Sequence, residues 1–494
     1  MYPFAWPADD VLFQRPVPTP TQQPEVKPLQ SRFTGLSARP LAPGILREYD
    51  IRGVFGESLT EDDVHTVGRC YGSIAWERGS RRIAVGYDGR ASSPALATAL
   101  TEGLVACGLT VCRIGLGPTP MLYFATHHLR ADGGIMVTGS HNPPEYNGLK
   151  MVLQGDSVHG EAIQELGRRA AAGGWVEGRG AAQVDDVFAD YVAMLRRTYA
   201  GDRAIDVVWD CGHGATGDVV NALVADLPGR HRVLFGRIDG SFPAHHPDPT
   251  VAKNLRDLIA AVTEGGFRLG VGFDGDGDRI GIVDAKGRIL WGDQILALLA
   301  RDVLKARPGA PILADVKSSQ VLFDEVAKAG GRPVMCRTGH SLIKAQMKDM
   351  GAPLAGEMSG HIFFADRFYG HDDAIYVALR FLDMLARDGT SAAELLDSLP
   401  RMHSTPELRV ECADERKFDV VERVKQRLAA EGSRFNGLDG VRVTVDGGWW
   451  LLRASNTQPA LVLRCEADSS EALQGLVSTV DALIRDFGLS LPDY

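Results

Sequence analysis

The feature that most constrains the fold is a pattern that recurs along the chain: an apolar, strand-like run ends in Asp, and small or basic residues follow. The pattern occurs at residues 83–88, 205–210 and 311–315. Helix-like segments lie between the strands, for example at 60–79, which opens with a capping box, and at 94–107. Alternating strands and helices predict parallel sheets and an α/β fold. The recurrence suggests similar α/β units, although buried strands often end in this way without any repeat.

The chain beyond Pro400 follows a different pattern. Residues 408–411 and 441–444 alternate apolar and polar side chains, as half-buried strands do. Helix-like runs lie at 415–431 and 471–487. This segment therefore predicts a smaller α+β module.

Composition narrows the class of protein. The 494 residues suffice for several domains, and 45% hydrophobic with 23% charged residues is ordinary for a globular protein. A net charge of -10 argues against nucleic-acid and anionic-membrane partners. No run is long enough to span a membrane, no leader pattern is visible, and seven scattered cysteines do not suggest disulfides or zinc. We expect a cytoplasmic protein whose residues 1–41, rich in Pro, Gln and Ser, form a disordered extension.

Residues 138–150 predict a rigid loop that presents a hydroxyl group. The apolar run 135–137 stops just before Ser140, and Pro143 and Pro144 exclude both a β-ladder and a helix. Reactive groups and ligands lie at such strand ends in open α/β sheets. A purely structural turn is the alternative, but the coincidence of several unusual features favours a reactive serine. The polar residues nearest to it in sequence are His141, Asn142 and Lys150.

Residues 274–279, with the sequence DGDGDR, predict a metal site. Carboxylates at alternate positions converge only if the backbone curls tightly, which the intervening glycines permit. Three neighbouring anions require a cation, and oxygen donors suit Mg²⁺ or Ca²⁺. An EF-hand is excluded because its twelfth position is Ala285, whereas a solvated acidic turn stays open as an alternative. Arg279 could bind a phosphate beside the cation, so this loop and the serine loop together suggest phosphoryl transfer.

Two further polar loops suggest substrate contacts. In residues 356–361, Glu357 and Ser359 would face the same way if extended and would suit sugar hydroxyls, although this motif taken alone is better explained as a plain loop. Residues 453–459 lie between two apolar strands and combine a guanidinium group, hydroxyls and an amide, which is typical of an anion receptor or of a generic polar hairpin. The receptor would use Arg453, Ser455, Asn456 and Thr457.

Together these motifs resemble the α-D-phosphohexomutase family, and within it the bacterial phosphomannomutase/phosphoglucomutase enzymes. The resemblance covers roughly residues 42–494, and the four main motifs occur in the order found in the family. It is carried by the segments 138–150, 274–279, 356–361 and 453–459, and it is supported by 47–53, 245–250 and 338–344.

The resemblance implies an α/β fold of three similar α/β domains with mixed sheets, followed by a C-terminal α+β domain, all around a central cleft. The four domains would carry the phosphoserine loop, the metal loop, the sugar-binding loop and the phosphate-binding loop, in that order. The expected ranges are 1–41 for the extension, 42–186 for domain 1, 187–290 for domain 2, 291–400 for domain 3 and 401–494 for domain 4.

The resemblance also implies the chemistry. Ser140 is expected to carry a phosphoryl group, to donate it to a hexose phosphate and to recover the other phosphate from a bisphosphorylated hexose intermediate. Mg²⁺ is expected on the phosphoserine and Asp274, Asp276 and Asp278. Lys150, Arg52 and His141 are expected to act in acid–base work or charge stabilisation at the serine. The expected substrate-binding residues are Tyr49, Arg279, Lys317, His340, Glu357, Ser359, His361, Arg453, Ser455, Asn456 and Thr457.

The sugar and the reaction class leave alternatives. Met358 resembles the residue in enzymes that act on both mannose and glucose phosphates, whereas Gln there would have suggested glucosamine, so phosphoglucosamine mutase stays as an alternative. A Mg²⁺-dependent sugar phosphatase is a second alternative, which a dedicated distal phosphate receptor argues against. A non-catalytic phosphosugar-binding protein is disfavoured because Ser140, Lys150 and the aspartates are intact. We expect a monomer with small-molecule partners, without nucleic acid or membrane.

Overall fold

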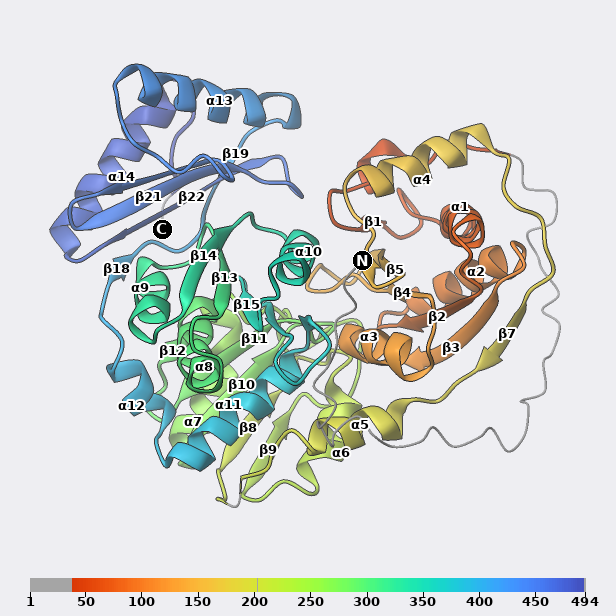
Figure 1. Ribbon diagram of the computed structural model, residues 1–494, viewed down its shortest axis with the longest axis horizontal. Helices are drawn as coiled ribbons and strands as arrows, with labels where there is room; N and C mark the ends of the chain where they lie inside the picture. The colour runs from red at the N-terminus through yellow and green to blue at the C-terminus, as the bar shows by residue number, and fades with distance from the viewer. Residues whose placement is uncertain (1–37, 202, 493–494) are drawn as a thin grey trace.

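The computed structural model describes residues 38–201 and 203–492, which form four domains (Figure 1). Most of the expected extension, residues 1–37, lies outside the described residues. Its last residues are packed on domain 1: the Arg39 N–H donates to the carbonyl of Ala170 at 3.0 Å, and Leu41 is buried. The folded part therefore begins before residue 42, because the Leu41 side chain adds to the core of domain 1.

Domain 1 is built on a mixed sheet in the order β1-β5-β4-β2-β3-β7, with β6 paired to β5. The strands β2, β3, β4 and β7 are parallel, whereas β5 is antiparallel to both β4 and β1. The capping box predicted at the start of the first helix is present, formed by Thr60 and Asp63. The elements are β1 Ile51–Val54, α1 Glu61–Glu77, β2 Arg82–Tyr87, α2 Ser93–Val105, β3 Thr110–Leu116, α3 Thr119–His128, β4 Gly133–Val137, β5 Tyr146–Leu153, β6 Asp156–Ser157, α4 Glu161–Ala172 and β7 Ala181–Val184.

Domains 2 and 3 each contain a five-stranded mixed sheet, in the orders β12-β11-β10-β8-β9 and β14-β13-β15-β16-β17. Domain 2 comprises α5 Phe188–Arg196, β8 Val207–Asp210, α6 Gly217–Val224, β9 His231–Leu234, α7 Arg256–Gly265, β10 Leu269–Phe273, β11 Ile280–Asp284 and β12 Ile289–Leu290. Domain 3 comprises α8 Gly292–Ala306, β13 Pro311–Asp315, α9 Gln320–Lys328, β14 Arg332–Cys336, α10 His340–Met350, β15 Leu354–Gly356, β16 Ile362–Phe364, β17 His371–Asp372, α11 Ala374–Asp388 and α12 Ala392–Asp397.

The three sheets share one strand arrangement, although β1 comes first in the sequence of its sheet, whereas β12 and β17 come last in theirs. The orders β3-β2-β4-β5-β1, β9-β8-β10-β11-β12 and β14-β13-β15-β16-β17 match strand for strand, with two parallel pairings followed by two antiparallel ones. The second strand in each of these orders, β2, β8 or β13, ends at or just before a buried aspartate: Asp88, Asp210 or Asp315. The expectation of three similar α/β units with mixed sheets is thus confirmed. The antiparallel hairpins β4–β5, β10–β11 and β15–β16 occupy equivalent places, and their connections carry the serine, acidic and sugar loops.

Domain 4 is the expected α+β module, an antiparallel sheet in the order β18-β22-β21-β20 with β19 also paired to β22. Figure 1 shows α13 and α14 on one face of this sheet, the face opposite domain 3. Val424, Trp450 and Ile484 belong to the core between them. The elements are β18 His403–Ser404, β19 Leu408–Glu411, α13 Asp414–Ala430, β20 Val441–Val445, β21 Gly448–Ala454, β22 Ala460–Ala467 and α14 Ser470–Arg485.

The cores show how the domains are joined. One hydrophobic cluster includes Phe124 of domain 1, Trp209 of domain 2 and Phe364 of domain 3, so these three domains share packed apolar surface. Domain 4 has its own main core. Among the described helices, none combines the length and apolar character needed to cross a bilayer.

Candidate active site

The serine loop holds Ser140 in an unusual backbone conformation. The φ angle of Ser140 is +50°, in the left-handed region that non-glycine residues rarely adopt. Its N–H donates to Thr138 Oγ1 at 2.8 Å, and its side chain is buried. Its Oγ donates to Asp274 Oδ2 at 2.9 Å and lies 3.2 Å from Nδ1 of His141. The structure thus brings the predicted serine to the predicted metal loop.

One arginine outside the loop fixes this conformation. The buried guanidinium group of Arg90 donates to several backbone carbonyls of the loop, including those of Ser140 and Asn142, each at 2.7 Å. Asp88 holds Arg90 in turn, through an ion pair of 3.1 Å. A Cβ at Gly139 would lie 2.5 Å from the guanidinium group, so only glycine fits there. Because several contacts hold the loop in place, Ser140 can keep its strained backbone conformation.

The acidic loop packs directly against the serine loop. Asp274, Asp276 and Asp278 are fully buried, and their oxygen atoms lie within 4.8 Å of one another. A Cβ at Gly275 would lie 2.4 Å from the carbonyl oxygen of Ser140, so glycine permits the close approach of the two loops. Each of the first two predicted motifs therefore forms one wall of the same site.

Lys150 from β5 lies between the carboxylates. Its Nζ donates to Asp276 Oδ2 at 2.7 Å and also to Asp278 Oδ2. Burial alone would lower the pKa of Lys150, but the charges of these two aspartates outweigh burial and raise the pKa well above its ordinary value. Burial and the charges of the other two aspartates raise the pKa of Asp274 instead. The site is therefore short of positive charge even with Lys150 in place.

The acidic loop fits a divalent cation. Asp276 Oδ1 is buried and has no hydrogen-bond partner, which is costly unless a cation or water binds it, and Asp278 Oδ1 is buried with His361 Nε2 3.2 Å away. The third carboxylate, Asp274, lies beside Ser140, so these four side chains together could present only oxygen donors, as Mg²⁺ and Ca²⁺ prefer.

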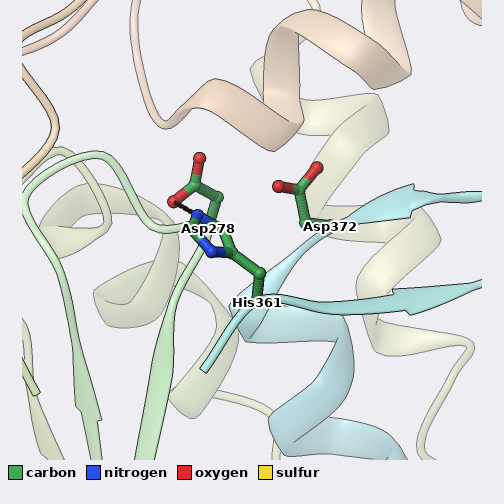
Figure 2. Close-up of side chains that lie close together, drawn as sticks. All are labelled: Asp278, His361 and Asp372. Carbon is green, nitrogen blue, oxygen red and sulfur yellow. Dashed lines mark ion pairs between the residues drawn. The ribbon is translucent and has the colours of Figure 1, made fainter. Parts of the chain in front are cut away.

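A second close group consists of Asp278, His361 and Asp372, whose possible ligand atoms also lie within 4.8 Å of one another (Figure 2). His361 lies 3.2 Å from Asp278 and 3.0 Å from Glu357. Although burial alone would lower the pKa of His361, the charge of Asp278 and the hydrogen bonds to both carboxylates raise it to about 9. A protonated imidazole does not bind metals, and Nζ of Lys344 already lies 3.3 Å from Asp372. This group is better described as a charged hydrogen-bond network than as a metal site.

The sugar loop places its polar residues around that histidine. Ser359 Oγ lies 3.1 Å from His361 Nδ1, and Glu357 Oε1 accepts the Gly339 N–H at 2.7 Å. The ring of His340 stacks on His361 with the ring centroids 5.7 Å apart. Arg279, the last residue of the acidic loop, is paired with His361 through a backbone bridge. The sugar and metal loops are therefore neighbours.

Four more of the predicted residues, Tyr49, Asn456, Arg453 and Lys317, lie where domains 1, 3 and 4 meet. Asn456 Nδ2 donates to Tyr49 Oη at 2.5 Å, and this hydroxyl donates to the carbonyl of Thr338 at 2.7 Å. Arg453 is buried and donates to Asp439 at 3.1 Å, and Lys317 pairs with Glu407 at 3.1 Å.

Three predicted residues contribute less directly to these groups. Arg52 donates to Asn142 Oδ1 of the serine loop at 2.5 Å. Ser455 Oγ accepts the backbone N–H of Gln458 at 3.2 Å, so this side chain shapes its own loop. Thr457 is exposed, and its backbone N–H donates to Ser455 Oγ of the same loop at 3.4 Å.

Some residues of the site lie outside the motifs that predicted it. Asp88 and Arg90 belong to the recurring strand pattern. That pattern predicted parallel sheets, but it did not predict a contact with the serine loop. Thr119, whose Oγ1 donates to Asp276 at 2.5 Å, and Asp372 stand in segments without any distinguishing pattern. Lys344 falls in the supporting segment 338–344 but was not expected in the site.

Family models match all four domains. The models describe phosphoglucomutase/phosphomannomutase α/β/α domain I at residues 44–175, domain II at 187–287, domain III at 291–402 and the C-terminal domain at 407–483. A phosphomannomutase/phosphoglucomutase of Pseudomonas aeruginosa is 43% identical over 452 residues, which is 92% of this chain and 98% of that protein. A phosphoglucomutase of Neisseria gonorrhoeae is 42% identical over 445 residues, 89% of this chain and 96% of that protein.

The solved structures agree with these matches. The crystal structure of a phosphoglucomutase/phosphomannomutase family protein from Burkholderia thailandensis superposes with a TM-score of 0.86 at 40% identity, covering 92% of this chain and all of that chain. A crystal structure from Thermus thermophilus superposes with a TM-score of 0.75 at 24% identity, covering 91% of this chain and all of that chain, and supports the fold. The chain therefore belongs to the phosphoglucomutase/phosphomannomutase family and is a phosphohexomutase.

Proposed function

We propose that this enzyme interconverts the 1- and 6-phosphates of mannose and glucose, with Ser140 as the phosphoryl carrier. The observation that carries the proposal is the buried contact of Ser140 Oγ with Asp274, 2.9 Å away, inside a site formed by three aspartates and Lys150. A hydroxyl held in strained backbone beside a cation site suits phosphoryl transfer, which depends mainly on positioning and charge neutralisation.

The reaction has two transfers. In the first, a sugar hydroxyl attacks the phosphorus of phosphorylated Ser140 and gives its proton to a base, while the serine Oγ–P bond breaks and Oγ takes a proton. In the second, the bisphosphorylated hexose presents its other phosphate. Ser140 Oγ attacks that phosphorus and gives its proton to a base, while the sugar oxygen leaves and takes a proton. Mg²⁺ held by Ser140, Asp274, Asp276 and Asp278 would neutralise the transferring phosphoryl group.

The residues beside the serine suit different parts of these transfers. Burial and nearby cationic groups hold the pKa of His141 well below its ordinary value, so its imidazole is neutral. Its Nδ1 lies 3.2 Å from Ser140 Oγ, within reach of the serine proton. Lys150 is protonated in this form and suits charge stabilisation and proton donation to the leaving oxygen. Arg52 donates to the carbonyl of Gly139 at 3.3 Å and adds positive charge at the same loop.

The distal part of the substrate needs a separate receptor, because a sugar that binds in two orientations must leave one phosphate far from the serine. We assign that phosphate to Arg453, Asn456 and the loop N–H groups around Ser455 and Thr457. Lys317, Tyr49 and His340 would line the path between the two phosphates. Glu357, Ser359, His361 and Arg279 would bind the sugar hydroxyls and the phosphate near the metal loop.

The sugar preference is supported by the names of the relatives, one a phosphomannomutase/phosphoglucomutase and one a phosphoglucomutase. Phosphoglucosamine mutase is the alternative. The cytoplasmic location also stays a proposal; all seven cysteines are buried. The monomeric state stays a prediction that size-exclusion chromatography with light scattering would test.

A coupled assay tests the proposal. The protein is given Mg²⁺, a trace of bisphosphorylated hexose and, in turn, mannose 1-phosphate, glucose 1-phosphate and glucosamine 1-phosphate. We expect isomerisation of the first two. Release of inorganic phosphate without isomerisation would support a phosphatase instead, and a preference for glucosamine 1-phosphate would favour the alternative mutase.

Replacing the carrier tests its assignment. We expect Ser140→Ala to lower turnover by about three orders of magnitude or more while the protein still binds glucose 1-phosphate in calorimetry. The exposed Ser478→Ala serves as a matched control with unchanged turnover. Wild-type turnover in Ser140→Ala would refute the assignment.

A further inference from the structure

Two arginines of domain 4 bind the backbone of the loop that carries Lys317. Arg442, on β20, donates from Nη1 to the carbonyl of Val316 at 2.6 Å and to that of Ser318 at 2.8 Å. Arg464, on β22, donates from Nη1 to the intervening carbonyl, that of Lys317. Three successive carbonyl oxygens of domain 3 are therefore satisfied by domain 4 and not by domain 3 itself.

The contact continues into the first turn of α9. Glu466 Oε1 accepts hydrogen bonds from Ser319 Oγ at 2.9 Å and from the Gln320 N–H at 3.0 Å. Asp293 Oδ2 accepts the Ser319 N–H at 2.9 Å and lies 3.3 Å from Arg464. Charged side chains thus bind the carbonyls of residues 316–318 and the amides of residues 319 and 320.

These charged groups are buried and fixed by an aromatic ring. Arg442, Arg464 and Glu466 are 3%, 7% and 2% exposed. The ring of Trp449 packs beneath Arg442, with its centroid 3.7 Å from Cζ, and its N–H donates to Glu466 at 2.8 Å. Buried ion pairs stabilise an interface little compared with apolar packing. The main effect of these charged groups is therefore to fix the geometry of the loop that they bind.

We propose that Arg442 and Arg464 are positioning residues for Lys317. They hold its backbone so that its ammonium group stays at Glu407, on the edge of the region assigned to the substrate. Arg464 also lies against the sulfur of Met358 in the sugar loop, which extends the same control to a second substrate loop. The inference rests on the proposed function, which makes Lys317 a substrate-binding residue, and it adds that domain 4 sets the geometry of two domain 3 loops.

A double-mutant cycle tests this. The variants are Arg464→Lys, Lys317→Met and the two combined. Arg464→Lys keeps the positive charge but loses the forked set of N–H donors of the guanidinium group. Arg427→Lys, at an exposed arginine of α13, is the matched control. We expect Arg464→Lys to raise KM for glucose 1-phosphate about tenfold while kcat changes less, and to have little further effect once Lys317 is replaced. Fully additive effects, or an unchanged KM, would overturn the inference.

Backbone amide exchange supplies a readout independent of turnover. In Arg464→Lys, the amides of Ser319 and Gln320 should exchange faster than in the wild type, whereas amides in α13 should not change. Equal exchange rates would overturn the inference. If Arg464→Lys does not fold, Arg442→Lys is tested in the same way. Absence of isomerisation by the wild type would count against the proposed function, and the exchange rates would still decide this inference.

Discussion

At the scale of residues, the site depends on side chains that hold other side chains. Arg90 fixes the serine loop through its carbonyls, and Lys150 occupies carboxylate oxygens that a cation would also bind. Ser140 and the three aspartates could be predicted from sequence because tight turns and repeated carboxylates have a direct physical meaning. Arg90 and Asp372 could not, since each acts through contacts with residues distant in the chain.

Lys150 and the divalent cation should compete. We expect Lys150→Met to bind Mg²⁺ about tenfold more tightly, or better, in the dephosphorylated protein, because the ammonium group 2.7 Å from Asp276 is removed. Titration calorimetry measures this. Lys286→Met, an exposed lysine paired with Asp397, is the control and should leave the affinity unchanged. Weaker binding by Lys150→Met would show that the lysine supports the cation site.

At the scale of elements, equivalent hairpins of three like sheets present the three loops of domains 1 to 3. The recurring strand that ends in Asp predicted these units, because an aspartate at a strand end binds the turn that follows: Asp88 accepts from Arg90 N–H and Thr138 Oγ1. The strand order was not predictable from such local patterns, since β1 precedes the rest of its sheet in sequence and pairs with β5. Short strands such as β17 also lack any periodic pattern.

The N-terminus of α11 should make stability depend on pH. Asp373 accepts the Tyr376 N–H and the hydroxyl of Tyr191, yet burial raises its pKa to about 7. Because the pKa is higher in the folded state than in the unfolded state, its contribution is full below about pH 4 and is lost as pH rises through about 7.

Asp373→Asn tests this sign. The amide cannot ionise, so the Tm of the variant relative to the wild type should improve as pH rises from about 4 and level off above about 7. Over this range, the free energy of unfolding of the variant relative to that of the wild type should rise by on the order of 4 kcal/mol. A difference in Tm that does not vary with pH would contradict the assignment.

At the scale of the whole molecule, domain 4 contacts both domain 3 and domain 1. Its loop reaches Tyr49 through Asn456, two residues separated by most of the chain. The family resemblance implied that these loops share a cleft, but the contact itself depends on how four domains pack, which no single segment encodes. The contacts of Arg442 and Arg464 could not be predicted from the sequence for the same reason, because their partners are backbone carbonyls of another domain.

The Tyr49 contact should contribute to substrate binding. We expect Tyr49→Phe to raise KM for glucose 1-phosphate several-fold, because the hydroxyl that joins Asn456 to the carbonyl of Thr338 is lost while the ring stays packed. Steady-state kinetics and the Tm are measured together. Tyr87→Phe, in the same domain, is the matched control. An unchanged KM in Tyr49→Phe would show that substrate binding does not depend on this contact.

The most direct test of the account follows the phosphoryl group on Ser140. The dephosphorylated protein is incubated with Mg²⁺ and a radiolabelled bisphosphorylated hexose, digested and mapped by mass spectrometry, and a second portion is chased with unlabelled mannose 1-phosphate. We predict that the label is on Ser140 and that the chase transfers it to sugar. Label on another residue, or its release as inorganic phosphate during the chase, would contradict the account.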